Sequence, residues 1–269
     1  MSDFLDHQTE PEPRKLDVLA AAREAYHGAW AHFGEMVRLI WLPGILYMAL
    51  SVAAALMQEP RQEGLRFLLE LAALFLWPII AVGWHRFVLI GDAAPGRFHL
   101  NFGRREARYL MVSILLGLLA TPGLLIASIS AVPSEPSLGM AGSLIGFLGI
   151  LLLMVGIYYY VRLLLLLPAV AVDEPVNTRL ILERTRGNFW RLVALVVIAG
   201  MPLFIIVFVL ASLVVLFDLP PFIVFIAAAG VSVFFMIVVV AVLSIAYREL
   251  IGPPGTLAFD LDQPEAPLN

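Results

Sequence analysis

The chain has 269 residues, of which 61% are hydrophobic and only 14% are charged, and its mean hydropathy is +0.92. Because a soluble domain contains about 25% charged residues, this composition excludes a soluble globular protein and predicts an integral membrane protein. The lack of cysteine excludes disulfides, cysteine-based zinc sites and thiol nucleophiles. Arginine supplies almost all of the positive charge, which is typical of a GC-rich bacterial genome.

The first part of the chain is too polar to cross a membrane. Residues 1–15 are acidic and contain proline without the apolar core of a signal peptide, so we expect a disordered tail there. From Leu16 through Trp30 to Val37, apolar residues recur at steps of three and four, which predicts an amphipathic helix. We expect this helix to lie at the membrane surface. The alternative is a helix that packs on a soluble partner.

Six apolar segments follow, each long enough to cross about 30 Å of hydrocarbon as a helix. They are Leu39–Met57, Leu65–His85, Tyr109–Val132, Gly142–Val161, Leu192–Phe217 and Phe222–Tyr247. The polar connections between them alternate between arginine-rich and arginine-poor segments. By the positive-inside rule, this asymmetry predicts that both termini and the two longer loops are cytoplasmic. We therefore predict an all-α membrane protein with six transmembrane helices.

Landmark residues also recur with a period close to one third of the chain. An aromatic residue stands thirteen positions before a proline at Trp30/Pro43, Tyr109/Pro122 and Phe189/Pro202, and the returning spans end at Arg86, Arg162 and Arg248. This register predicts three pseudo-repeated helical hairpins, each preceded by a cytoplasmic interfacial amphipathic helix. The repeats cover approximately 16–91, 92–172 and 173–252, which together form one membrane domain, 16–252. We expect residues 253–269 to form a disordered C-terminal tail.

Two features of the fourth span have competing explanations. Gly142, Gly146, Gly149 and Gly156 share one helix face, which favours close packing against another helix over lining a pore. Arg162 is an interfacial anchor if the span ends at Val161, and an intramembrane charge if the span continues to Val172. We favour the anchor because the repeat equates Arg162 with the other span-ending arginines. The apolar segment 163–172 would then lie in a cytoplasm-facing layer against the other interfacial helices.

Two groups of arginines lie on the predicted cytoplasmic side. The first contains Arg97, Arg104, Arg105 and Arg108, and the second contains Arg179, Arg184, Arg186 and Arg191. Arginines next to a span attract anionic lipid headgroups, so all eight are candidate headgroup ligands. The alternative is that they only set the topology. The formal net charge of −4 argues against nucleic-acid binding.

Catalytic and metal-binding patterns are weak or lacking in the sequence. His32 and Glu35 share a helix face at a spacing that di-metal bundles use, but further ligands are lacking, and we interpret both as interfacial polar residues. Ser143 lacks the GxSxG context, and no histidine lies in a matching span to form a Ser–His pair. We therefore expect no catalytic residue, no cofactor and no metal.

The joint between the fourth and fifth spans carries a family resemblance. Residues 162–175 read RLLLLLPAVAVDEP, and residues 181–197 read ILERTRGNFWRLVALVV. This joint resembles that of six-helix bacterial membrane proteins similar to the membrane domain fused to some glycerophosphoryl diester phosphodiesterases. The resemblance covers about residues 16–252 and implies a plasma-membrane protein with a role in envelope or lipid homeostasis. It brings no catalytic residue, because this sequence contains no hydrolase domain.

These observations predict a non-catalytic, lipid-interacting inner-membrane protein that is an accessory or scaffold in envelope or lipid homeostasis. Its expected partners are membrane lipids, bound through anionic headgroups on the cytoplasmic face. The alternative is a transporter of a lipid or apolar solute built on the three hairpins. The residues after the three prolines, GILYM, GLLIA and LFIIV, do not match the mitochondrial carrier signature. The spans also contain few ionisable residues, which argues against transport of a polar solute.

Overall fold

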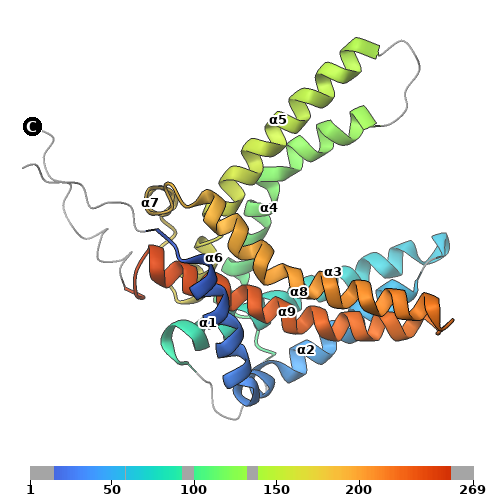
Figure 1. The fold of residues 1–269 in the computed structure, drawn as a ribbon, viewed down its shortest axis with the longest axis horizontal. Helices are drawn as coiled ribbons and strands as arrows, with labels where there is room; N and C mark the ends of the chain where they lie inside the picture. Colours follow the sequence, from blue (N-terminus) through green and yellow to red (C-terminus); the bar gives the residue numbers. More distant parts are fainter. Residues whose placement is uncertain (1–14, 58, 93–99, 132–138, 256–269) are drawn as a thin grey trace, which may run out of the picture.

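The computed structural model describes residues 15–57, 59–92, 100–131 and 139–255 (Figure 1). All regular elements in these ranges are helical. They are α1 (Val18–Ala31), α2 (Phe33–Leu56), the short 3-10 helix η1 (Pro60–Gln62), α3 (Glu63–Ile90), α4 (Arg104–Ala131), α5 (Gly139–Leu163), α6 (Leu166–Ala171), α7 (Thr178–Arg184), α8 (Phe189–Leu216) and α9 (Pro221–Leu250). The two predicted tails lie almost entirely outside the described residues, as does Arg97.

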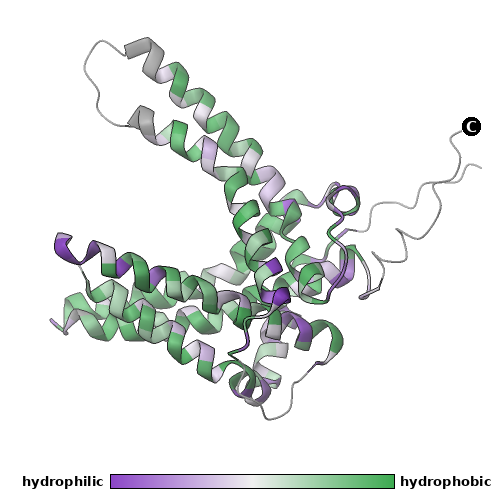
Figure 2. Ribbon diagram, turned by 180° about the vertical axis from the view of Figure 1, so that it is seen from behind, coloured by the Kyte–Doolittle hydropathy of each residue, from purple (hydrophilic) through white to green (hydrophobic). Residues whose placement is uncertain are grey.

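Six of these helices are long and apolar enough to cross a membrane, one for each predicted segment. Figure 2 shows hydrophobic residues along the long helices, and hydrophilic residues around α1 and α7 and at the start of α3. The helices extend past the predicted segments, since α4 begins at Arg104 and α9 ends at Leu250. Hydropathy marks the limits of the hydrocarbon, whereas helical hydrogen bonds continue into the headgroup layer, which explains the extra residues.

Consecutive long helices pack as pairs: α2 with α3, α4 with α5, and α8 with α9. Helix α9 also packs on α1, α2 and α3, whereas the α4–α5 pair projects away from the other long helices (Figure 1). The described chain begins and ends at the same end of this bundle, where α1, α6 and α7 also lie (Figure 1). We call this end the arginine-rich end, because Arg86, Arg104, Arg105, Arg162 and Arg248 lie there.

Glycines bring α4 and α5 into backbone contact. A Cβ atom added at Gly123 of α4 would lie 2.5 Å from the Cα atom of Leu153, and one at Gly149 of α5 would lie 2.6 Å from the backbone nitrogen of Ala127. Gly156 likewise abuts the backbone of α4. The predicted packing role is therefore confirmed for Gly149 and Gly156, and Gly123 is its counterpart on the facing helix.

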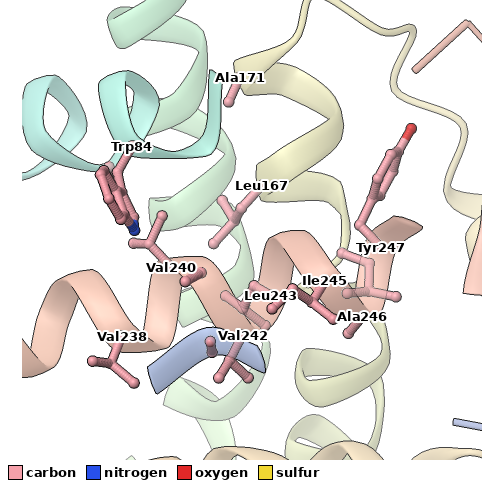
Figure 3. Close-up of a cluster of buried hydrophobic side chains, with 14 of the residues drawn as sticks. Trp84, Leu167, Ala171, Val238, Val240, Val242, Leu243, Ile245, Ala246 and Tyr247 are labelled. Atoms are coloured by element: carbon pink, nitrogen blue, oxygen red, sulfur yellow. The ribbon is translucent and has the colours of Figure 1, made fainter. Parts of the chain in front are cut away.

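Helix α6 lies in the core of the arginine-rich end. All six of its residues are buried. Leu167 and Ala171 lie near Trp84 of α3 and Leu243 of α9 (Figure 3). The prediction for residues 163–172 was a layer against interfacial helices, but α6 packs mainly on the long helices α3, α4 and α9. Because this segment is apolar on every side, it is stable only when other helices surround it.

Two aromatic residues that precede span-ending arginines are also buried. Trp84 is 1% exposed and Tyr247 is 0% exposed, and both belong to the core shown in Figure 3. Aromatic residues near the ends of membrane spans commonly lie at the membrane interface. Trp84 and Tyr247 lie inside the protein instead, because the ends of α3 and α9 pack beneath α6.

Helix α1 packs on α8 and α9 through small side chains. Its buried residues are Ala21, Ala22, Ala25 and Ala29. Two residues of the predicted apolar stripe, Leu19 and Trp30, are 71% and 70% exposed. Leu19 and Trp30 therefore face away from the protein, and the alanine face allows α1 to approach its neighbours closely.

Polar contacts fix both α1 and the residues before it. The side chain of Asp17 accepts a hydrogen bond from the backbone nitrogen of Ala20, which caps the first turn of the helix. The Tyr26 hydroxyl donates to the carbonyl of Ala199 in α8 at 2.8 Å. The Tyr26 bond holds α1 against α8, whereas the Asp17 bond stabilises the start of α1 itself.

Candidate functional site

A pocket of about 520 Å³ opens at the arginine-rich end between α2, α3 and the start of α4. One wall is apolar, and the other carries charged side chains of both signs. The apolar wall includes Leu39, Ile79, Val82 and Gly83, and the charged side chains are Arg86, Asp92, Arg104, Arg105, Glu106 and Asp173. An apolar wall beside a charged wall can accommodate an amphipathic molecule.

Asp173 joins two helices through this pocket. Arg105 of α4 donates from Nε to Asp173 Oδ1 at 3.0 Å and from Nη2 to Oδ2 at 2.5 Å. Arg86 of α3 donates from Nη1 to Asp173 Oδ2 at 3.3 Å and forms an ion pair with Asp92 at 2.6 Å. The hydrogen bond from Arg105, together with the nearby guanidinium charges, lowers the pKa of the Asp173 carboxyl below its ordinary value.

The turn after α6 determines where this carboxylate lies. Asp173 has a φ of 65°, and the backbone nitrogen of Glu174 donates to the carbonyl of Ala169 at 2.9 Å. The nitrogen of Asp173 donates to the carbonyl of Val170, which completes a Schellman motif with Asp173 at the left-handed position. Aspartate is one of the few residues other than glycine that adopt this conformation readily. The motif turns the chain beside α3 and α4, where Asp173 meets both arginines.

The start of α4 supplies cations that are free of ion pairs. Glu106 accepts a hydrogen bond from the backbone nitrogen of Gly103 at 2.8 Å, which is one half of a capping box. Arg104 and Arg108 are exposed, and neither forms an ion pair within the described part of the chain. Of the arginines that line the pocket, only Arg104 therefore has a guanidinium that is not paired with a carboxylate.

The second predicted group of arginines is dispersed around α7 and the start of α8. Arg179 pairs with Glu183 at 3.1 Å and is 84% exposed. Arg191 donates to the carbonyl of Leu16 at 2.7 Å, which ties α8 to the residue before α1. Arg184 and Arg186 are exposed. These four arginines do not line the pocket, and Arg97 lies outside the described residues.

The three span-ending arginines all bind protein groups. Arg86 binds Asp92 and Asp173, as described above. Arg162 is 8% exposed, and its guanidinium donates to the Thr185 hydroxyl, the Tyr158 hydroxyl and the Leu182 carbonyl. Arg248 forms an ion pair with Glu24 of α1 at 2.6 Å. In each case the arginine ties the end of a long helix to a polar segment of the chain.

A buried polar cluster, which the sequence analysis missed, links three long helices. His85 of α3 donates from Nδ1 to the Ser244 hydroxyl of α9 at 2.7 Å, and the Tyr109 hydroxyl of α4 lies 3.4 Å from Nε2. Ser244 itself donates to the carbonyl of Val240 at 2.9 Å, so its proton already has an acceptor. All three side chains are fully buried. The cluster therefore acts as an interhelical link.

The sequence contained a signal for this cluster, because His85 and Ser244 are polar residues in apolar spans. We considered a Ser–His pair only for Ser143, whereas the structure pairs His85 with Ser244. His32 is not part of a polar cluster, and its ring packs on Phe87 at 5.5 Å. Among the described residues, no group of three or more histidine and acidic residues is arranged to hold a metal ion.

Comparisons with family models, with curated proteins and with solved structures return no match to this chain. The resemblance carried by the joint at residues 162–197 therefore stays a prediction.

Proposed function

We propose that this chain is a non-catalytic, lipid-interacting protein of the bacterial plasma membrane, and that it is an accessory or scaffold protein in envelope or lipid homeostasis. The observation that carries the proposal is the pocket at the arginine-rich end, with an apolar wall beside a charged wall. A phospholipid has the same division, since its phosphate group lies next to glycerol and acyl chains. The arginine-rich end is the cytoplasmic end, in line with the positive-inside rule.

Exposed arginines outside the pocket extend this lipid-binding surface. Arg108 beside the pocket, and Arg179 and Arg186 near α7, present their side chains to solvent at the same end of the bundle. Each arginine near a membrane surface contributes about 1 kcal/mol to the attraction of anionic lipids. These arginines contact anionic headgroups around the protein, while the pocket holds a single headgroup.

The proposal includes a threefold repeat of hairpins. The contacts of the span-ending arginines support it, because each arginine binds the segment that precedes the next hairpin. Arg86 binds Asp92, which precedes α4. Arg162 binds the carbonyl of Leu182 in α7, which precedes α8. Arg248 binds Glu24 in α1, which precedes α2, so the three contacts close in a ring.

Native mass spectrometry of the protein in mild detergent tests the lipid interaction. We expect Arg104→Gln with Arg108→Gln to retain fewer phospholipids per protein than the wild type. Arg61→Gln is the matched control, because Arg61 is exposed at the opposite end of the bundle and forms no ion pair within the described residues. Equal lipid retention by all three proteins would refute a headgroup site at the start of α4.

A second pocket favours one alternative function, a lipid transporter. This pocket has about 470 Å³ and lies between α2 and α3 toward the opposite end, where Tyr47, Arg66, Glu70 and Trp77 line it. A transporter needs access for its substrate at both membrane faces, and the α2–α3 pair has one pocket toward each. Flux of a labelled lipid across proteoliposomes separates the two functions, because a scaffold produces no flux.

A further inference from the structure

The charges that line the pocket at the arginine-rich end are balanced. Three side chains are cationic and three are anionic, and they are Arg86, Arg104, Arg105, Asp92, Glu106 and Asp173. A pocket built only to attract an anion would have an excess of positive charge. This balance bears on the kind of headgroup that the pocket takes.

Asp173 already occupies the position that an anionic ligand would need. Its carboxylate receives hydrogen bonds from Arg86 and Arg105, which come from two different helices. Two guanidinium groups that converge on one carboxylate also form an arrangement that binds phosphate. An anionic headgroup that used these arginines would have to displace Asp173 and leave its carboxylate without a partner. Arg104 is therefore the cation that remains for a phosphate.

Carboxylate oxygens in the pocket remain open to a cation. Asp92 accepts through Oδ2 from Arg86, and Glu106 accepts through Oε2 from the Gly103 nitrogen. The other oxygen of each carboxylate has no hydrogen-bond partner within the described part of the chain. The pocket thus offers one guanidinium and two carboxylate oxygens beside an apolar wall.

We propose that this pocket selects a zwitterionic phospholipid headgroup, which carries a phosphate and an ammonium group, over an anionic headgroup. The phosphate binds Arg104, the ammonium binds Asp92 and Glu106, and the glycerol and upper acyl chains lie on the apolar wall. Asp173 sets the preference, because it withdraws Arg105 from the ligand and, together with Asp92, withdraws Arg86. This inference rests on the proposed function, since it concerns the headgroup taken by the same pocket.

The test is competition between two lipids for delipidated protein in mild detergent, measured by native mass spectrometry. Phosphatidylethanolamine and phosphatidylglycerol with identical acyl chains are added in equal amounts. We expect the wild type to retain more phosphatidylethanolamine. Asp173→Asn keeps a residue that tolerates the left-handed turn and frees the guanidinium of Arg105, while Arg86 keeps its ion pair with Asp92. Its retention ratio should therefore shift toward phosphatidylglycerol by at least about tenfold.

Control variants separate the site from general charge effects. Asp218→Asn is matched to Asp173→Asn, because Asp218 also has a positive φ of 49° and lies at the opposite end of the bundle. We expect Asp218→Asn to retain lipids as the wild type does. Asp92→Asn with Glu106→Gln is an independent variant that leaves Asp173 in place, and it should lose phosphatidylethanolamine selectively.

The outcomes distinguish a failure of this inference from a failure of the proposed function. A wild-type preference for phosphatidylglycerol that Arg104→Gln abolishes would overturn the zwitterion inference and leave the lipid site standing. An equal shift in Asp173→Asn and Asp218→Asn would also overturn it. Unchanged retention of both lipids in Arg104→Gln would overturn the proposed function itself.

A further arm of the test distinguishes a lipid from a soluble ligand. Soluble O-phosphoethanolamine carries the same charged groups but lacks the parts that would contact Leu39, Ile79 and Val82. We expect it to compete only weakly with the lipid. Complete displacement of phosphatidylethanolamine by an equal amount of O-phosphoethanolamine would assign the site to a soluble phosphoamine and overturn the assignment to a lipid.

Discussion

Replacing Gly123 with Ala tests whether backbone contact holds α4 and α5 together. The added Cβ atom would lie 2.5 Å from the Cα atom of Leu153, whereas ordinary contact begins at 3.4 Å. The backbone nitrogen of Leu153 would lie closer still, so the two backbones must separate by more than about 0.9 Å, since the obstructing atoms belong to a helix backbone and no side chain can move aside. Because van der Waals packing drives helix association in membranes, this separation weakens contacts along the whole pair.

The expected loss follows from overpacking. An extra methyl group in a closely packed interior costs about 1–3 kcal/mol. Alanine is also a better helix former than glycine by about 1 kcal/mol, which offsets part of that loss. Gly117→Ala isolates the offset, because Gly117 lies on the same helix with no atom within 4 Å of an added Cβ. The difference between the two variants therefore measures the packing cost alone.

The assay is thermal unfolding of the detergent-solubilised protein, followed by circular dichroism. At about 2–4 °C per kcal/mol, we expect the unfolding midpoint of Gly123→Ala to lie about 2–12 °C below that of Gly117→Ala. Gly149→Ala should behave like Gly123→Ala, since its Cβ would meet the backbone of α4 at 2.6 Å. Equal midpoints for all three variants would show that α4 and α5 do not pack through these glycines.

Other predictions concern both ends of the bundle. Arg162→Gln removes three hydrogen bonds to protein acceptors. Because an unpaired buried polar group costs about 1–3 kcal/mol, the unfolding midpoint of this variant should fall, and Arg162→Lys should recover part of the loss. The hydrogen bond from Arg105 holds the pKa of Asp173 below its ordinary value of 3.8. The ionised carboxylate therefore stabilises the folded protein above pH 3.8, and this stabilisation is lost as the pH falls through the lowered pKa. Asp173→Asn should therefore lose less stability than the wild type on acidification from about pH 6 to about pH 3, and an identical acid response would contradict the role of Asp173. Because the chain lacks cysteine, a single introduced cysteine is its only thiol. Asp218→Cys should react with a membrane-impermeant maleimide in intact cells, and Arg186→Cys should react only after permeabilisation. The reverse pattern would place the arginine-rich end outside the cell.

The six membrane-spanning helices were predictable because their cause is local. About 20 consecutive apolar residues are enough to specify a span, whatever the rest of the chain does. The packing face of α5 was predictable for a similar reason, since glycines at helical spacing lie on one face. Its partner was not predictable, because the counterpart Gly123 lies on another helix and no local pattern relates the two helices.

The charged pocket could not be predicted, because its contacts join distant residues. Asp173 bonds to Arg105, 68 positions earlier, and to Arg86, 87 positions earlier. These pairs depend on the left-handed turn after α6, and the burial of α6 among long helices depends in turn on the tertiary fold. His85 and Ser244 are 159 positions apart, so their pairing is equally remote from any local pattern.

The span-ending arginines show why the choice of arginine matters in any test of lipid binding. The sequence alone predicts one shared role for Arg86, Arg162 and Arg248, in which each anchors a helix end to lipid phosphate. In the structure all three bind protein groups, so replacing them changes the contacts between segments of the chain, and a loss of bound lipid could then follow from a change in the fold. Arg105 has the same difficulty, because it binds Asp173. Arg104 lines the pocket without an ion pair, and its replacement therefore tests the headgroup site without removing an ion pair that joins the helices.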